Sequence, residues 1–167
     1  MEDNKNEGQE SFVSSSEFMQ ARLGEELEQA LRTMMTAREY PRGGALFRQG
    51  ATATGLYLVE RGSVRVLLAA AENQNQLLEV VSPGALLGLS DSVTGDRYRV
   101  TAVAAEPTVA GFVDRGIFLE FLSSQHELCM QVVRLLSDNL HGLYHKFRNV
   151  SAHPGRPRRR SLNQRLS

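Results

Sequence analysis

The sequence predicts a mainly β fold, a barrel, sandwich or roll, with a helical segment on either side of it. Apolar residues recur at helical spacing from residue 17 to about residue 37. Short β-rich runs separated by glycine and proline then occupy residues 40–114. Helical spacing returns from residue 114 to about residue 150. The length of 167 residues suits one such domain with tails.

The first helical segment follows a polar tail. Residues 1–16 are expected to be disordered, because they have too little apolar surface to bury. One of the serines at positions 14–16 is a candidate N-cap. The helical pattern then runs through Phe18, Leu23, Leu27, Ala30, Leu31 and Met34. We expect Arg38–Pro41 to break this helix.

Five short runs of β-forming residues follow, each bounded by turn residues such as Gly62 or Gly84. They are Leu56–Val59, Val64–Leu67, Leu77–Val81, Val100–Ala104 and Val109–Val113. Asp91, Asp96 and Glu106 lie near turns between these runs, and we expect them to be solvated carboxylates.

The last helical segment predicts a dimer. Asp114 is a candidate N-cap for a short helix through Phe121, and Ser123 or Ser124 for the main helix. Two apolar series in the main helix are offset by three residues, like positions a and d of a heptad, and they predict a dimer seam. The predicted seam residues are Cys129, Val133, Leu136, Leu140, Leu143 and Phe147. Val150 continues the pattern, and a second stripe contains Leu128, Val132, Leu135 and Tyr144. One stripe is expected to pack on the chain's own β domain and the other on a partner; alternatively, both are intramolecular core.

Composition and charge argue for a cytoplasmic protein. Hydrophobic residues make up 41% and charged residues 23%, and 19 basic residues balance 19 acidic ones, so nothing global indicates a nucleic-acid or membrane partner. The single cysteine, Cys129, allows no intramolecular disulfide. The polar N-terminus lacks the apolar segment of a secretory signal, and no apolar run approaches the ~20 residues that span a bilayer.

The end of the sequence is locally basic. Residues 151–167 contain five arginines and no acidic residue, and Pro154, Gly155 and Pro157 discourage a helix. We expect a disordered tail that could make salt-sensitive contacts with phosphates. The alternative is a solubilising tail or the remnant of a truncated gene.

Four stretches carry a resemblance to a known family. Phe47–Gly50 and Gly55–Val64 resemble its first hairpins, Pro83–Gly88 the start of its phosphate-binding cassette, and Thr101–Glu106 the strand that leaves the cassette. On these motifs, residues 17–150 resemble the cyclic-nucleotide-binding-like sensor domain of bacterial Crp/Fnr transcription regulators. The resemblance implies an antiparallel double-stranded β-helix (a jelly-roll-like β-roll), an N-terminal helix, and a long dimerisation helix at about residues 124–150.

The cassette departs from the pattern that binds cyclic nucleotides. In the family, amides at a helix N-terminus and an arginine hold the cyclic phosphate, and a glutamate after the cassette glycine accepts a hydrogen bond from the ribose 2′-hydroxyl. Here Leu89 stands at the glutamate position and Tyr98 at the arginine position. Arg97 and Arg99 flank Tyr98, but a one-residue slip turns a strand side chain to the opposite face.

The energetic cost of these departures is large. Leaving the 2′-hydroxyl unpaired costs ~1–3 kcal/mol and losing the charged hydrogen bond costs ~1.5–3 kcal/mol, together roughly two to four decades of affinity. Tight binding of cyclic AMP or cyclic GMP is therefore not expected; the alternative is a functional binder that uses Arg97 or Arg99. The candidate pocket residues are Leu87, Gly88, Leu89, Ser90, Arg97, Tyr98, Arg99, Thr101 and Asn139.

Other functions find little support in the sequence. One cysteine cannot hold an iron–sulfur cluster, and His141 with His145 lacks a nearby third ligand for a metal or haem. No nucleotide-binding loop, nucleophile elbow or zinc motif indicates an enzyme. The 17 residues after Val150 do not pattern as a helix-turn-helix, so sequence-specific DNA binding is not expected. The remaining alternative is an interaction module that heterodimerises with longer Crp/Fnr relatives without a ligand.

Overall fold

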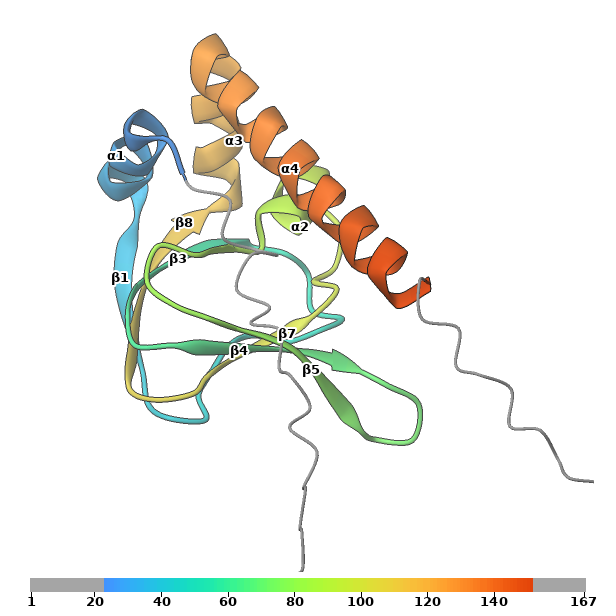
Figure 1. The fold of residues 1–167 in the computed structure, drawn as a ribbon. Helices are drawn as coiled ribbons and strands as arrows, with labels where there is room; N and C mark the ends of the chain where they lie inside the picture. The colour runs from blue at the N-terminus through green and yellow to red at the C-terminus, as the bar shows by residue number, and fades with distance from the viewer. Residues whose placement is uncertain (1–22, 152–167) are drawn as a thin grey trace, which may run out of the picture.

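The computed structural model describes residues 23–151, which form a β-roll with four helices gathered at one end (Figure 1). Two four-stranded antiparallel sheets make the roll, with strand orders β1-β8-β3-β6 and β2-β7-β4-β5. The strands are β1 (Thr36–Tyr40), β2 (Ala45–Phe47), β3 (Gly55–Arg61), β4 (Val64–Ala69), β5 (Asn75–Val81), β6 (Leu86–Leu87), β7 (Thr101–Ala104) and β8 (Thr108–Asp114). The helices are α1 (Glu25–Met34), α2 (Leu89–Thr94), α3 (Arg115–Ser124) and α4 (His126–Ser151). The predicted β-roll with a helix on either side is confirmed. The predicted disordered tails were residues 1–16 and 151–167. Ser151 is the last residue of α4, and the other residues of both tails lie outside the described part of the chain.

The end of the first helix was predicted wrongly. α1 ends at Met34, and the chain turns extended at Met35 (φ −85°, ψ 152°) and enters β1, instead of remaining helical to about Ala37. β1 pairs along its whole length with β8, from Thr36 opposite Phe112 to Tyr40 opposite Thr108. It is an edge strand with four exposed residues, so no apolar alternation marks it in the sequence.

Two apolar clusters hold the domain together. One fills the inside of the roll; the other joins the helices to the roll. The second includes the fully buried Phe118 of α3, Leu27 and Leu31 of α1, and Leu56 and Val113 of the strands. α4 packs on α1 and α3 (Figure 1), and its buried residues Val132 and Leu135 belong to this second cluster.

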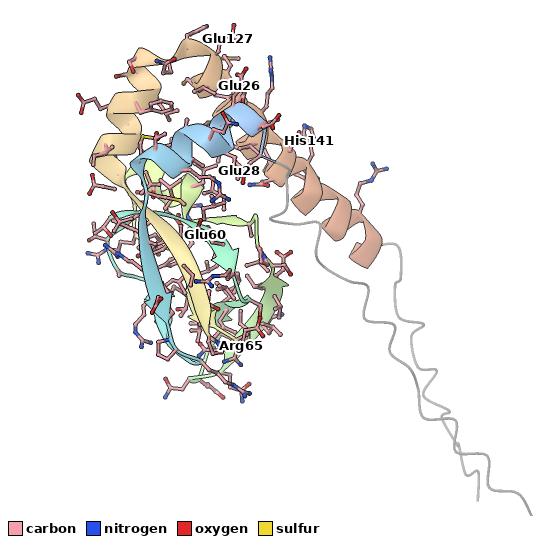
Figure 2. The ribbon with its side chains drawn as sticks, turned by 90° about the vertical axis from the view of Figure 1, so that its left-hand side faces the viewer. Glu26, Glu28, Glu60, Arg65, Glu127 and His141 are labelled. Atoms are coloured by element: carbon pink, nitrogen blue, oxygen red, sulfur yellow. The ribbon has the colours of Figure 1, made fainter. Side chains whose placement is uncertain are left out.

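A surface ion-pair network links α1 to β3. Arg32 Nη2 lies 2.9 Å from Glu28 Oε1, and Arg32 Nη1 lies 2.7 Å from Glu60 Oε1. Figure 2 shows Glu28 on α1 and Glu60 below it on the roll. Because these side chains are partly exposed, the network contributes more to orientation than to stability.

The predicted N-cap of α3 is confirmed, whereas the predicted N-cap of α4 was wrong. The side chain of Asp114 accepts a hydrogen bond from Ile117 N at 3.1 Å, which confirms it as the N-cap of α3. Neither Ser123 nor Ser124 caps α4. Their hydroxyls instead donate to the carbonyls of Glu120 and Phe121, one turn back in α3.

Gly62, between β3 and β4, provides a stability test. Its φ is +88°, and a Cβ there would lie 2.5 Å from Thr108 Oγ1 and 2.6 Å from the Pro107 carbonyl oxygen. Gly62→Ala should therefore lower the free energy of unfolding by ~1–3 kcal/mol. Urea denaturation checks this; an unchanged midpoint would contradict the tight turn. Gly43→Ala is the control for crowding. Gly43 has a similar φ of +83°, but a Cβ there would meet nothing within 4 Å, so its loss of stability measures the backbone strain alone.

Candidate functional site

The segment that corresponds to the cassette runs from β6 through α2 to the start of β7. Gly88 adopts a left-handed conformation (φ 76°) before α2, and Gly95 does the same after it. The chain then returns along the roll, where Tyr98 N donates to Ala51 O at 2.9 Å and Gly50 N donates to Tyr98 O at 2.8 Å. These bonds fix which side chains of Arg97–Arg99 face the interior.

Tyr98 is the side chain of this segment that fills the roll. It is 3% exposed. Its hydroxyl donates to Gly55 O at 2.6 Å and accepts from Gly55 N at 3.2 Å. Its ring also lies close to the cassette glycine, because a Cβ on Gly88 would come within 3.1 Å of Tyr98 Cε1. Tyr98 thus connects the start of α2 to the start of β3.

An aromatic group continues from Tyr98 across the roll. The ring of Phe47 stacks on Tyr98 at a centroid distance of 4.2 Å and contacts Tyr57 at 5.6 Å. Phe112 follows at 5.1 Å from Tyr57, and the Arg38 guanidinium covers Phe112 at 3.8 Å. Burial is the main cause that raises the pKa of Tyr57, so this phenol stays neutral. Phe47 and Tyr57 were not predicted as part of the site. The sequence signal that could have indicated them is their position on the two neighbouring predicted hairpins.

Both arginines that flank Tyr98 lie on the outside. Arg97 Nη1 donates to Gly50 O at 2.8 Å. Arg99 is 71% exposed at its side chain and lies 3.5 Å from Asp91 and 3.6 Å from Asp96. Neither guanidinium enters the aromatic group.

The other candidate pocket residues do not form one surface. Leu87 is buried inside the roll, whereas Leu89 belongs to the apolar cluster beneath the helices. Ser90 is exposed on α2. Thr101 is partly buried, and its hydroxyl accepts a hydrogen bond from Gln49 N at 2.9 Å. Asn139 is partly buried on α4.

Asp91 is more buried than the sequence suggested. We expected a solvated carboxylate, but Asp91 is 7% exposed in the first turn of α2. It accepts a hydrogen bond from Arg99 N at 3.4 Å. Burial raises its pKa, while the hydrogen bond and the charge of Arg99 oppose that rise. A turn position alone does not reveal such burial, because packing of α2 against the roll and α3 causes it.

The raised pKa of Asp91 gives a pH prediction. A carboxyl whose folded pKa lies above its unfolded pKa loses stabilising effect as pH rises through the folded value. The free energy of unfolding of Asp91→Asn, minus that of the wild type, should therefore increase from pH 3 to pH 7. Chemical denaturation at several pH values checks this. If this difference in unfolding free energy decreases from pH 3 to pH 7 instead, the effect of Arg99 on the pKa of Asp91 is larger than the effect of burial.

The outward side of α4 is apolar. Val132 and Leu135 of the second stripe are buried in the apolar cluster that joins the helices to the roll, so this is the stripe that packs within the chain. Tyr144 was wrongly assigned to that stripe, since it is 60% exposed. Val133 and Leu140 of the predicted seam are 49% and 50% exposed, and Met130 lies open beside them. Cys129 and Leu136 are partly buried at the edge of the helix cluster; the side chains of Leu143 and Phe147 lie outside the described part of the chain.

Among residues 23–151, no group of three or more His, Cys, Asp and Glu side chains could hold a metal ion. His141 is exposed on α4 (Figure 2), and the His145 side chain is outside the described part. None of the helices in the same range is long and apolar enough to cross a bilayer.

Comparison with known proteins identifies the family. Residues 37–125 match the family described as the cyclic nucleotide-binding domain. The chain is 24% identical over 117 residues to the fumarate and nitrate reduction regulatory protein of Vibrio cholerae, covering 70% of this chain and 46% of that protein. It is 25% identical over 112 residues to the CRP-like cAMP-activated global transcriptional regulator of Mycobacterium tuberculosis. This match covers 66% of this chain and 50% of that protein. The crystal structure of the Thermus thermophilus catabolite activator protein superposes with a TM-score of 0.68 at 25% identity, covering 81% of this chain and 63% of that chain.

The fold and these matches place the protein in one class. The chain belongs to the cyclic nucleotide-binding domain family, and the similar curated proteins are regulatory proteins. The chain spans about half the length of the curated relatives it matches.

Proposed function

We propose that this chain is a regulatory domain of the Crp/Fnr type whose roll interior is filled by its own aromatic side chains and which does not bind cyclic AMP or cyclic GMP tightly. The proposal rests mainly on the position of Tyr98. Its ring stacks on Phe47 and lies against Gly88, and its hydroxyl donates a hydrogen bond to Gly55 O. A ligand at the cassette would have to displace this side chain before making any contact.

The energetics support a closed interior. Displacing Tyr98 breaks two hydrogen bonds to Gly55 and leaves its backbone groups unpaired, at ~1–3 kcal/mol for each buried group. The nucleotide would also lack the glutamate at position 89 and an inward arginine. Arg97 and Arg99, the alternative phosphate ligands, are already bonded to Gly50 O and placed beside Asp91 and Asp96 on the outside.

The second part of the proposal is a homodimer in the cytoplasm, formed through α4. Val133 and Leu140 are half-exposed on the side of α4 that faces away from the roll, and Met130 and Tyr144 widen this apolar surface. A two-fold pair of such helices would bury the exposed apolar surface of each copy. A heterodimer with a longer Crp/Fnr relative would use the same surface and is the competing proposal.

Native mass spectrometry of the purified protein tests both parts. The expected result is a species with the mass of two chains and no stoichiometric small molecule. A bound molecule that survives purification would contradict the filled interior. A monomer that becomes a dimer only when a longer relative is co-expressed would favour the competing proposal.

A further inference from the structure

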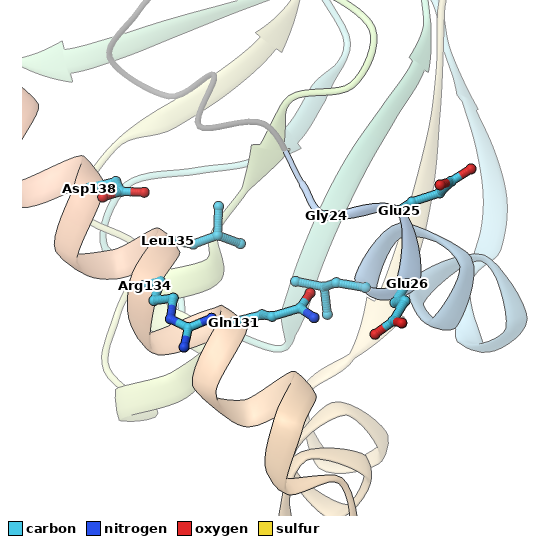
Figure 3. Close-up of a pocket in the computed structure, with 8 residues that line it drawn as sticks. Gly24, Glu25, Glu26, Gln131, Arg134, Leu135 and Asp138 are labelled. Atoms are coloured by element: carbon cyan, nitrogen blue, oxygen red, sulfur yellow. The ribbon is translucent and has the colours of Figure 1, made fainter.

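A groove separates the start of α1 from the middle of α4. It encloses about 520 Å³. Figure 3 shows Gln131 reaching from α4 toward the first turn of α1, with Asp138 further along α4. The groove is lined by Gly24, Glu25, Glu26, Leu27, Gln131, Arg134, Leu135 and Asp138. It lies outside the roll and uses none of the candidate pocket residues.

The groove is acidic overall. Glu25, Glu26 and Asp138 contribute three carboxylates against the single guanidinium of Arg134. None of these four groups forms an ion pair with another side chain that the structure describes, whereas the neighbouring Glu28 is paired with Arg32. Acidic residues favour the first turn of a helix, which accounts for Glu25 and Glu26 but not for Asp138 in the middle of α4.

A buried acceptor lies in the same groove. Gln131 is partly exposed, but its Oε1 atom is shielded from solvent and has no hydrogen-bond partner among the side chains and backbone that the structure describes. It faces Gly24 so closely that a Cβ at position 24 would lie 2.9 Å from it. A buried acceptor without a donor costs ~1–3 kcal/mol, and a donor-rich group in the groove would recover that energy once the Gln131 side chain turns its oxygen toward that group.

The chemistry fits a guanidinium group. Guanidinium carries five N–H donors and no acceptor, matches carboxylates bidentately and packs its flat face on apolar side chains such as Leu27 and Leu135. The sequence supplies such groups in residues 152–167, which contain five arginines and no acidic residue. We propose that the groove between α1 and α4 binds arginines of residues 152–167 of the same chain.

The distances allow this contact. Ser151 lies 13 residues beyond Asp138 on α4, which is ~20 Å of helix. Seven extended residues reach ~24 Å, so Arg158 is the first arginine of the Arg158–Arg160 run that can return to Asp138. Nine residues reach ~31 Å, which brings Arg160 to the level of Gln131, ~30 Å from Ser151.

The bound segment would tie the two helices together. α1 and α4 meet through few contacts besides Leu27 and Leu135, so a segment that neutralises Glu26 and Asp138 would hold α4 against α1. The same arginines would then be withheld from nucleic-acid phosphates. This inference does not depend on whether the roll interior binds a ligand.

Paramagnetic NMR on the full chain tests the proposal. A nitroxide is attached to Ser161→Cys in a Cys129→Ser background, so that the label is unique. The amide signals of Glu26, Gln131 and Asp138 should lose most of their intensity, while that of Glu72 at the β4–β5 turn should not. The loss should disappear in ~1 M salt, where the Debye length is ~3 Å.

Charge-neutral variants provide the control. Glu26→Gln with Asp138→Asn should abolish the loss, whereas Glu72→Gln with Glu106→Gln, which removes the same charge from exposed positions on the roll, should preserve it. Full intensity at Glu26, Gln131 and Asp138 in low salt would overturn the proposal. It would also be overturned if the loss survives in Glu26→Gln/Asp138→Asn, or if the labelled segment broadens signals only after duplex DNA is added.

Discussion

Tyr98→Ala is expected to lower the free energy of unfolding by ~3–5 kcal/mol, the range for a large aromatic side chain removed from a core. The ring is 3% exposed and stacks on Phe47, and its hydroxyl both donates to and accepts from Gly55. Truncation would leave a cavity between β3 and the start of α2. Urea denaturation followed by circular dichroism measures the change.

Two further variants separate the contributions of the ring and the hydroxyl. Tyr98→Phe keeps the ring but leaves the backbone groups of Gly55 without their partner, so a loss of ~1–3 kcal/mol is expected. Arg97→Ala, at the exposed neighbouring position, should change stability by less than ~0.5 kcal/mol. If Tyr98→Ala cost as little as Arg97→Ala, the filled interior would be contradicted.

The pair Val133→Glu and Leu140→Glu is expected to weaken dimerisation by at least ~100-fold, which corresponds to ~2.7 kcal/mol. Both residues are half-exposed on the outward side of α4, so the isolated subunit tolerates a carboxylate at either position. In a dimer, each carboxylate would be buried opposite an apolar partner and near its own symmetry copy, where it is costly. Sedimentation equilibrium measures the dissociation constant.

A matched control tests whether charge alone is responsible. Gln74→Glu with Gln76→Glu adds the same charge at exposed positions of the β4–β5 hairpin and should leave the dissociation constant unchanged. The helical circular dichroism of the Val133→Glu/Leu140→Glu variant should match that of the wild type. A variant that remains dimeric at wild-type concentrations would exclude the outward side of α4 as the dimer surface.

Sequence periodicity predicted the elements that bury an apolar face. The runs that became β3, β4, β5, β7 and β8 alternate or are continuously apolar, and their turns carry glycine, so their positions were predicted closely. β1 was missed because its edge position leaves Thr36–Glu39 exposed. β2 and β6 were missed because strands of three and two residues have no measurable period.

The site was less predictable than the fold. The identity of residue 98 was known from the sequence, but its partners Phe47 and Gly55 lie more than 40 residues away and meet it only in the folded roll. Leu89 was expected at a ligand, yet α2 turns it toward the helix cluster, because a helix directs neighbouring residues to different faces. Tyr144 lies nine residues after Leu135, which places it about half a turn away on the helix, so the spacing itself should have excluded it from the second stripe.

Calorimetric titration of the purified protein with cyclic AMP and cyclic GMP tests the central claim most directly. The account predicts no heat of binding up to millimolar nucleotide, because Tyr98 occupies the space next to Gly88 and neither Arg97 nor Arg99 points inward. Micromolar binding would contradict it, since it would require Tyr98 to leave the interior and Arg97 or Arg99 to take its place.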